Sequence, residues 1–567
     1  MKKRLIVIAV AVVAILVIAY FGVGRKVVDK YTYGTDYANL EEYYEISGDE
    51  LKVILQDDKI GYKALNRNGA CYFPLQMINA YIGDGFFYDP DYNNGTLMFT
   101  VADGTYENEV GSSSYIYEGG PGSYAYAISI LDAGNLYIAA DYVAKFYNFT
   151  YTVTDKHVQV YTEWSEYTRM EITANTQIRV LGGIKSEILR DVEKGEMVEL
   201  LEEMEEWSKV KTSDSYIGYI ENKKMKNMGV VSEPSPIAPV LPTASELLLD
   251  RKVCLGFHSI GGVGGNDTIY EMMQEGQGMN VIAPTWFSLN DNEGGIRNFG
   301  TANYVNIAHN SGLQVWAVVD DFNYKTETGS SISNLSILGN TESRRRLESN
   351  IMDAAVALGV DGINLDFELI TSDSGPYFAQ FVKELSVLTH AKGIVLSIDD
   401  YVPAGREFYR FDVQGQFADY VIMMGYDEHW HGCGNPGSVA SFDHVAGGLD
   451  KLLENIPARK LVNALPFYTI VWKSDASGVS DSYLTLTNQA DYISRLGISY
   501  SWDEDACQNY AEWMSGGTTY QVWLEDEESI SAKLNAMNSR EIGGVAVWRL
   551  GYGTASVWNI IKLYAQN

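Results

Sequence analysis

One short segment of the chain, residues 361–368 (Asp-Gly-Ile-Asn-Leu-Asp-Phe-Glu), alternates apolar and polar side chains. Alternate side chains of a β-strand share one face, so Asn364, Asp366 and Glu368 should point one way and the apolar residues the other. The helix-like run 354–360 before it favours a buried parallel strand over a solvated edge strand. Carboxyl groups this close cannot both ionise freely, so one should keep its proton to higher pH, as a general acid must.

Beyond residue 245 the pattern alternates short apolar runs with helical stretches, which predicts a parallel sheet of the α/β class. Eight runs qualify as strands: 252–257, 280–284, 314–319, 362–368, 395–398, 419–424, 460–465 and 544–548. Eight strands in about 320 residues are expected for a TIM (β/α)8 barrel. The stretch 472–525 is too long for one ordinary connection and predicts a small inserted α/β lobe that walls one side of the cleft.

The residues before the barrel predict further domains, because 567 residues exceed one compact core. Residues 48–165 contain a weak repeat of strand, helical turn and hairpin, which predicts a small α/β domain. Residues 170–228 read as about five short strands and predict an all-β domain. Four of the thirteen prolines fall in the linker 229–244, a stiff connection to a catalytic domain at 245–567.

The first residues predict a membrane segment. Three basic residues, 2–4, precede an apolar run from Leu5 to Val23, which is long enough to span a bilayer as a helix. We expect residues 1–26 to form a cytoplasmic tail and a single-pass signal anchor in the cell membrane, with the catalytic domain extracytoplasmic. A cleaved signal peptide, and hence a secreted protein, is the alternative.

Composition excludes some partners. The net charge of −32 argues against nucleic acid, because nothing in the chain would neutralise phosphates. The four cysteines are scattered without Cys-x-x-Cys spacing, which favours neither a disulfide framework nor zinc.

The segment 361–368 resembles the Asp-Gly-x-Asp-x-Asp-x-Glu signature of family 18 glycoside hydrolases, which lies on the fourth strand of a TIM barrel. Two further matches follow in the right order at strand ends. Met424-Gly-Tyr-Asp427 resembles the family's Met-x-Tyr-Asp motif, and Trp548 stands where the family has the aromatic floor beneath the reacting sugar. The chain departs from the signature at Asn364, where the family has its middle Asp, so we expect an altered pH profile.

This resemblance implies a retaining, substrate-assisted mechanism. Glu368 would protonate the glycosidic oxygen and later deprotonate water, while the substrate's own 2-acetamido oxygen attacks the anomeric carbon to form an oxazolinium ion. Asp366 would orient the acetamido group, and Tyr426 would donate a hydrogen bond to it. The substrate must then carry an N-acetyl group, and no cofactor is implied.

Substrate contacts are expected from six residues at or near strand ends: Asn364, Asp427, Trp548, Met424, Trp286 and Tyr468. Weaker candidates, named from position alone, are Phe287, Asp320, Asp321, Asp399, Asp400, Tyr401, Phe467 and Trp523. His429, His431 and Cys433 alternate after the sixth strand and suggest a metal site. A loop lining the cleft is the favoured interpretation, because no fourth ligand is evident, and we therefore expect no metal.

The N-terminal modules carry resemblances of their own. Residues 48–165 resemble the small α/β domain at the N-terminus of copper amine oxidases, without implying copper. Residues 170–228 resemble the bacterial Src-homology-3-like (SH3-like) fold, whose modules often bind cell-wall peptide or glycan. A spacer without a ligand is the alternative for the second module, because a fold does not fix a function.

Residues 426–430, Asn364 and the run 548–551 most resemble the branch of family 18 found in spore-germination and cortex-lytic enzymes. That branch implies cleavage of β-N-acetylglucosaminyl bonds in peptidoglycan. A chitinase or an endo-N-acetylglucosaminidase would use the same residues. A non-catalytic glycan-binding protein on the same scaffold is the rival from another class, and the presence of both Asp366 and Glu368 favours an enzyme.

Overall fold

The structure is a computed structural model that describes residues 2–232, 234–243, 246–322, 325, 329 and 331–566. It divides into two compact units. The N-terminal unit comprises Met1–Phe86, Asn108–Tyr115 and Pro121–Leu241, and the barrel unit comprises Phe87–Glu107, Ile116–Gly120 and Pro242–Asn567. Ser245, next to which we expect the catalytic domain to begin, lies outside the described residues.

Eight parallel strands form a closed barrel, because β20 pairs with β21 on one side and with β33 on the other. They are β20 (Val253–His258), β21 (Val281–Leu289), β23 (Gln314–Asp320), β24 (Gly362–Asp366), β25 (Val395–Tyr401), β26 (Tyr420–Met424), β27 (Leu461–Pro466) and β33 (Gly544–Trp548). Each predicted apolar run coincides with one of these strands. The prediction of a TIM barrel is therefore confirmed.

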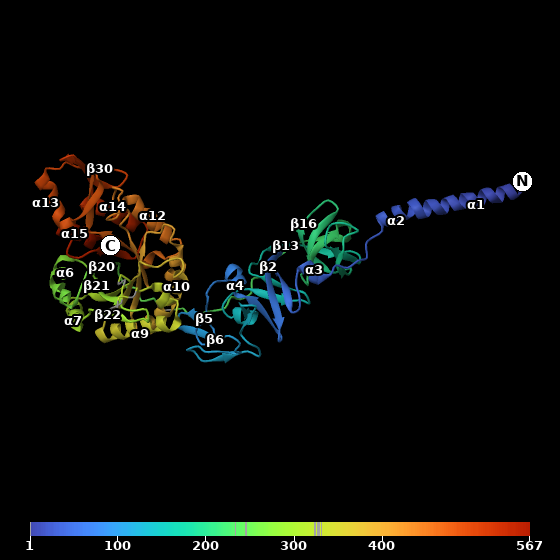
Figure 1. Cartoon of the computed structure of the whole chain (residues 1–567), viewed down its shortest axis with the longest axis horizontal. Coiled ribbons are helices and arrows are strands. Elements are labelled where there is room, and N and C mark those ends of the chain that lie inside the picture. Colours follow the sequence, from blue (N-terminus) through green and yellow to red (C-terminus); the bar gives the residue numbers. More distant parts are fainter. Residues whose placement is uncertain are drawn as a thin grey trace. The chain divides into compact units, whose positions relative to one another are not determined.

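Helices surround the barrel strands (Figure 1). They are α6 (Ile269–Glu275), α7 (Ala302–Asn310), α8 (Asn334–Leu338), α9 (Thr341–Leu358), α10 (Gly375–His390), α11 (Phe411–Phe417), α12 (Phe442–Leu452), α14 (Glu527–Ser539) and α15 (Ala555–Gln566). A short strand, β22 (Ile296–Asn298), pairs antiparallel with the end of β21.

Side chains of the barrel strands alternate between two hydrophobic cores. Ile363 and Leu365 of β24 belong to the outer core, between the strands and the helices. Trp316 and Tyr420 belong to a second core made by the strands themselves, where their rings pack 5.2 Å apart. Because successive strand residues point to opposite faces, Asn364 and Asp366, which alternate with Ile363 and Leu365, point into the barrel.

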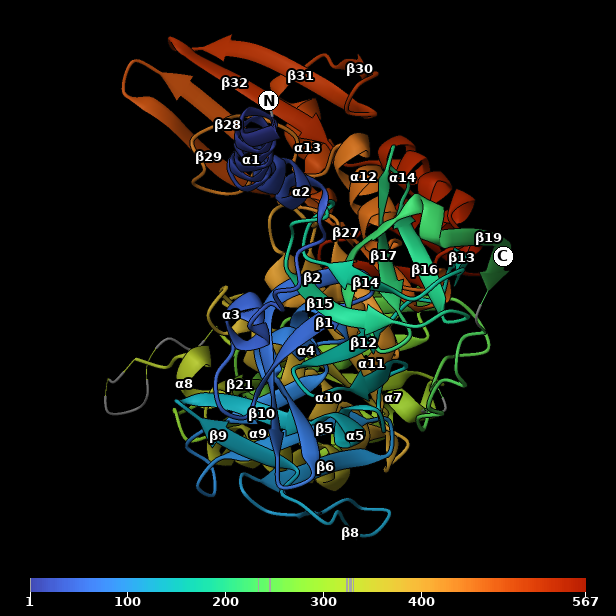
Figure 2. The ribbon, with the colours of Figure 1, turned by 90° about the vertical axis from the view of Figure 1, so that its right-hand side faces the viewer.

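The predicted inserted lobe lies between β27 and β33. It is an antiparallel sheet in the order β29-β28-β32-β31-β30 with one helix, and its strands run side by side in Figure 2. Its elements are β28 (Tyr468–Asp475), β29 (Gly478–Thr485), α13 (Leu486–Leu496), β30 (Ser501–Asp503), β31 (Gln508–Ser515) and β32 (Thr518–Leu524).

Residues 87–107, which the sequence assigns to the first module, pack with the barrel unit. They carry most of a three-stranded sheet of β4 (Phe86–Asp89), β5 (Thr96–Val101) and β6 (Gly104–Glu109). The amide nitrogen of Gln380 in α10 donates to Thr100 Oγ1 over 3.0 Å, and Arg345 of α9 pairs with Glu107 at 2.6 Å. Such long-range polar contacts leave no periodic pattern in the sequence.

Two seven-stranded sheets make up most of the N-terminal unit, which also contains a two-stranded sheet of β7 (Ser114–Tyr115) and β8 (Gly122–Ser123). The first has the order β11-β12-β1-β2-β3-β10-β9, and the second, in the all-β region, has the order β15-β14-β18-β17-β16-β13-β19. The first sheet contains β1 (Glu50–Leu55), β2 (Asp58–Arg67), β3 (Ala70–Pro74), β9 (Ser129–Asp132), β10 (Asn135–Ala139), β11 (Thr150–Val153) and β12 (His157–Tyr161). The second contains β13 (Glu166–Ile172), β14 (Thr176–Arg179), β15 (Ile188–Val192), β16 (Met197–Glu202), β17 (Trp207–Thr212), β18 (Ile217–Glu221) and β19 (Met225–Ser232).

Short helices complete the N-terminal unit: α3 (Leu40–Tyr44), α4 (Leu75–Tyr81) and α5 (Ala140–Val143). Helices α4 and α5 directly follow β3 and β10, which matches the expected repeat of a strand and a helical turn.

The chain begins with a continuous helical stretch of α1 (Lys2–Ala19), a π-helical turn (Tyr20–Gly24) and α2 (Arg25–Tyr31). Within it, Ile8–Tyr31 is long and apolar enough to cross a membrane. Length and composition support a membrane segment or a signal sequence equally well.

A buried ion pair ties α9 to α10. The guanidinium of Arg344, fully buried, donates to Glu384 at 2.6 Å and to the carbonyl oxygen of Leu338 at 2.8 Å. Burial by itself raises the pKa of Glu384, but the charge and hydrogen bond of Arg344 more than offset this, so the pKa lies below its usual value. Arg344 is therefore the main group that keeps this buried carboxylate ionised, with smaller contributions from Gln380 and Arg345.

Replacing Arg344 should destabilise the barrel. In Arg344→Leu the carboxylate of Glu384 remains buried without its cation, so we expect the free energy of unfolding at pH 7 to fall by about 3–5 kcal/mol. Urea denaturation of the full chain measures this. The control is Arg540→Leu, whose partner Asp450 is 62% exposed and whose loss should cost less than about 1 kcal/mol. Equal losses of stability in the two variants would contradict the stabilising role given to the buried Arg344–Glu384 pair.

Candidate active site

The polar face of β24 points into the barrel, as its alternation predicts. Asn364 is fully buried, and Asp366 is 7% exposed at the carboxyl end of the strand. The Oδ1 atom of Asp366 has no hydrogen-bond partner among the residues that the structure describes. Glu368 lies two residues beyond the strand and is half-buried. Catalytic groups of TIM barrels occur at this end of the strands.

A third carboxyl group, Asp399 of β25, shares the barrel interior with Asp366. The side-chain amide of Asn364 donates to Asp399 Oδ1 over 2.8 Å and to Ser397 Oγ over 3.0 Å. Burial raises the pKa of Asp366 well above its usual value, and the charges of Asp399 and Glu368 raise it further. The pKa of Asp399 is also raised, again chiefly by burial. The site therefore holds protons that isolated aspartates would lose.

Glu368 is fixed by contacts to both its backbone and its carboxyl group. Asp321 accepts hydrogen bonds from the backbone N–H groups of Glu368 (3.0 Å) and Leu369 (2.9 Å). The hydroxyl of Tyr401 donates to Glu368 Oε2. Burial raises the pKa of Glu368, the Tyr401 hydrogen bond lowers it, and nearby Asp321 and Asp427 raise it again, so that the net shift is upward.

The end of β26 contributes the Met-x-Tyr-Asp motif. Burial keeps the pKa of the Tyr426 phenol well above its usual value, so the hydroxyl remains a hydrogen-bond donor. Tyr468 donates to Asp427 Oδ1 over 2.5 Å. At Gly425 a Cβ atom would lie 2.3 Å from Asn463 Oδ1, which explains why a glycine precedes the tyrosine.

Aromatic side chains from three strands meet at this end of the barrel. Tyr426 and Trp548 both pack against the inner core, and both also contact the cluster that contains Tyr468. The Trp548 ring lies 5.7 Å from that of Phe257, and the peptide bond that follows Trp548 is cis. Aromatic faces of this kind suit the apolar face of a sugar ring.

Four of the six sequence-predicted contact residues are buried: Asn364, Trp286, Tyr468 and Met424. Trp286 is 1% exposed, donates its indole N–H to Asn266 Oδ1 over 2.8 Å and packs edge-on against Tyr304. A register shift between Thr285 and Phe287 turns both Trp286 and Phe287 into the outer core. The structure therefore does not bring Trp286 to the other candidates. Met424, the first residue of the Met-x-Tyr-Asp motif, is 6% exposed.

The His429 and Cys433 side chains contact the same carbonyl oxygen, that of Asn435, whereas His431 contacts a different residue. His429 Nδ1 lies 2.9 Å from the carbonyl oxygen of Asn435, and His431 pairs with Asp481. Within the described ranges, no group of three histidine, cysteine or carboxylate residues is arranged to hold a metal.

Little in the sequence indicated which residues hydrogen-bond to the motif around Glu368. Asp321, Asp399 and Tyr401 were candidates by position alone, yet each hydrogen-bonds a residue of the motif. Arg406, whose guanidinium lies 3.8 Å from the Tyr401 ring centroid and lowers the pKa of Glu368, was not predicted. Its position in a loop after the fifth strand was the available signal, since loops at this end of a barrel carry functional groups.

Comparisons with known proteins agree with the geometry. The chain is 25% identical over 304 residues to an uncharacterized glycosylase of Bacillus subtilis (strain 168), covering 50% of this chain and 84% of that protein. It is 26% identical over 237 residues to the cortical fragment-lytic enzyme of the same organism, covering 40% of this chain and 55% of that protein.

The crystal structure of the Bacillus cereus spore cortex-lytic enzyme has the same fold, with a TM-score of 0.50 and 20% identity over 58% of this chain and 78% of that chain. The family described as glycosyl hydrolases family 18 matches residues 261–553, which is more than half of the 567 residues. The match includes β24, the motif after β26 and Trp548. The chain therefore belongs to glycoside hydrolase family 18.

Proposed function

We propose that the barrel cleaves β-N-acetylglucosaminyl bonds in peptidoglycan by a retaining, substrate-assisted mechanism. The proposal depends on one observation: Asp366, Glu368 and Tyr426 lie together at the carboxyl ends of the strands, a buried and a half-buried acid beside a phenol. In this class the substrate's N-acetyl group replaces an enzyme nucleophile.

Glu368 is the general acid and base of the proposed reaction. Its raised pKa keeps the proton available for the glycosidic oxygen at a pH where a free glutamate would have lost it. After the leaving group departs, the same carboxylate takes a proton from the attacking water. Tyr401 and Asp321 are positioning residues, because they hold the carboxyl group and the backbone of Glu368.

Asp366 and Tyr426 act on the acetamido group. As its oxygen attacks the anomeric carbon, positive charge develops on the forming oxazolinium ring, and a carboxylate at Asp366 stabilises that charge. The Tyr426 hydroxyl donates to the acetamido oxygen and so aims it. Asp427, held by Tyr468, binds sugar hydroxyls, and Trp548 forms the floor beneath the reacting ring.

Asp399 supplies the acid that Asn364 no longer provides. It is hydrogen-bonded to Asn364 Nδ2 and raises the pKa of Asp366 through its charge. A carboxyl group on the neighbouring strand thus influences the protonation of Asp366, a role that the family's middle Asp would otherwise fill from the same strand.

Peptidoglycan is the favoured glycan because the similar Bacillus protein is named a cortical fragment-lytic enzyme. The chain spans little more than half of that protein, so the assignment rests on the barrel. A chitinase or an endo-N-acetylglucosaminidase with the same site is the alternative. We further infer that the apolar N-terminal helix anchors the enzyme in the cell membrane with the barrel outside the cytoplasm, or is removed from a secreted form.

Removing the proton donor tests the enzyme assignment. We expect Glu368→Gln to lower kcat/KM on purified peptidoglycan and on N-acetylglucosamine oligosaccharides by about 10²–10⁴-fold, because general acid catalysis is lost. In the unchanged enzyme, activity should decline as pH rises through the raised pKa of Glu368. Release of reducing-end sugar measures both.

Glu454→Gln, at a residue 57% exposed beyond α12, is the matched control and should keep full activity. Equal inertness of the unchanged protein and Glu368→Gln, with glycan binding retained by both, would identify a lectin and overturn the proposal.

Replacing Asp399 tests its coupling to Asp366. Asp399→Asn removes a neighbouring negative charge, so the pKa of Asp366 should fall and the carboxylate should form at lower pH. We therefore expect the acidic limb of the kcat/KM profile to move to lower pH.

Asp400→Asn is the control, because Asp400 is the next residue of β25, accepts from Gln414 of α11 and faces the helices. It should leave the acidic limb unmoved. An acidic limb that is the same in Asp399→Asn and in the unchanged enzyme would contradict the role given to Asp399.

A further inference from the structure

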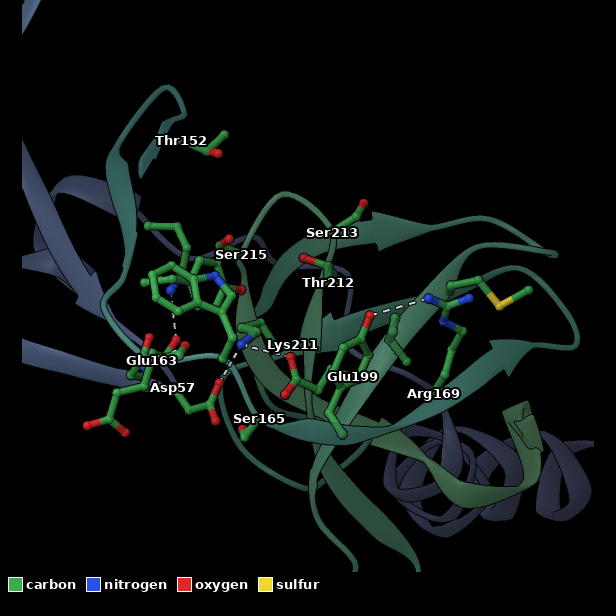
Figure 3. A pocket seen from close by; sticks show the side chains of 17 residues that line it. Asp57, Thr152, Glu163, Ser165, Arg169, Glu199, Lys211, Thr212, Ser213 and Ser215 are labelled. Carbon is green, nitrogen blue, oxygen red and sulfur yellow. Dashed lines mark hydrogen bonds and ion pairs between the residues drawn. The ribbon is translucent and has the colours of Figure 1, made fainter. Parts of the chain in front are cut away.

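A cavity of about 650 Å³ lies within the N-terminal unit, far along the chain from the barrel motifs. Its wall combines the two sheets: β11 and β12 of the first sheet face β13, β16 and β17 of the second, and the connection 163–165 crosses between them (Figure 3). Its volume falls within the roughly 300–1,000 Å³ of small-molecule sites. Nothing in the proposed reaction uses it.

The central charges of the cavity compensate one another. The Lys211 ammonium, 4% exposed, pairs with Asp57 and with Glu199, the latter at 2.8 Å, as Figure 3 shows. Burial lowers the pKa of Lys211, but its hydrogen bonds to Asp57 and Glu199 raise it more, so the ammonium stays charged. A charged ligand would have to displace one of these partners, at the cost of a buried unpaired ion.

Neutral groups remain to bind a ligand. Gln159 is 1% exposed, and its side-chain nitrogen donates to the carbonyl oxygen of Gln56 over 2.7 Å. Gln159 and Gln56 both line the cavity, and the Oε1 atom of each is buried without a hydrogen-bond partner in the described part of the chain. Buried amide oxygens normally find a donor, and leaving one unpaired costs about 1–3 kcal/mol.

Aromatic rings and hydroxyls supply the rest of the wall. Tyr161, Trp164 and Tyr167 line the cavity, and the Tyr161 ring is also contacted by the Lys211 ammonium at 5.0 Å. Hydroxyls of Ser165 and Ser213 stand at exposed positions of the wall. A ligand that fits must therefore present apolar faces to the rings and many uncharged polar groups to the amides and hydroxyls.

We propose that this cavity binds a neutral oligosaccharide. Sugar hydroxyls hydrogen-bond to the polar side chains that line the cavity, among them Ser165 and Ser213, and sugar ring faces stack on the aromatic side chains. An anionic ligand would meet three carboxylates of the wall (Asp57, Glu163 and Glu199) against two cations (Lys211 and Arg169), and an apolar ligand would leave the polar groups unsatisfied. The choice of N-acetylglucosamine sugars as the probe rests on the function proposed for the barrel.

The test is calorimetric titration of the full chain with the pentasaccharide of N-acetylglucosamine, in a Glu368→Gln background that prevents cleavage. We expect two binding sites. Adding Trp164→Ala should weaken one of them at least about tenfold, as loss of a tryptophan at a binding hot spot does, and leave the other unchanged. Adding Trp548→Ala should weaken only the barrel site.

Two further variants complete the test, one as a second way to block the site and one as a control. Ser213→Trp places a bulky side chain on an exposed position of the wall and should block the same site if Trp164→Ala fails to fold. Tyr81→Ala, at a 42% exposed tyrosine of the same unit outside the cavity, is the matched control and should leave both sites intact.

A single site that responds only to Trp548→Ala, or two sites that ignore both Trp164→Ala and Ser213→Trp, would overturn this inference. Failure of the barrel is distinguishable, because hydrolysis by the unchanged enzyme is measured separately. An inert barrel with an intact site at Trp164 would overturn the proposed function and leave the cavity assignment standing.

Discussion

The chemistry of this protein depends on placing acidic side chains inside a closed parallel barrel. A charged carboxylate is costly to remove from water, so Asp366 and Asp399 keep their protons to a higher pH than free aspartates. Closure of the barrel by the β20–β33 pairing encloses these side chains, and the substrate meets them at the carboxyl ends of the strands, where the catalytic groups of TIM barrels lie.

The neighbouring hydrogen bonds and aromatic side chains fix the position of Glu368 and of the sugar that binds beside it and Asp366. Asp321 binds the backbone where β24 ends, and Tyr401 binds the carboxyl group of Glu368, so the acid is fixed before a substrate arrives. Such preorganisation is worth more in a partly dry site than in water, because the protein dipoles need not reorient during the reaction. The aromatic side chains after β26, β27 and β33 then define where a sugar ring can lie.

Periodicity was sufficient to find all eight barrel strands, because strands buried on both faces form nearly continuous apolar runs. The alternation in 361–368 also placed the polar face of β24 correctly. It could not place Trp286, since a register shift after Thr285 breaks the alternation that the interpretation relies on. Neither the packing of residues 87–107 with the barrel nor the cavity beside Lys211 was visible, because both arise from contacts between residues far apart in the sequence.

The central claim is that the substrate's own acetamido group does the work of a nucleophile, guided by Asp366 and Tyr426. The most direct test compares kcat, at saturating substrate, for a pentasaccharide of N-acetylglucosamine and the same pentasaccharide with free amines. The account predicts turnover of the acetylated sugar and a loss of turnover for the amine that higher substrate concentration does not restore. Comparable kcat values for the two sugars would contradict the mechanism and require a nucleophile from the protein.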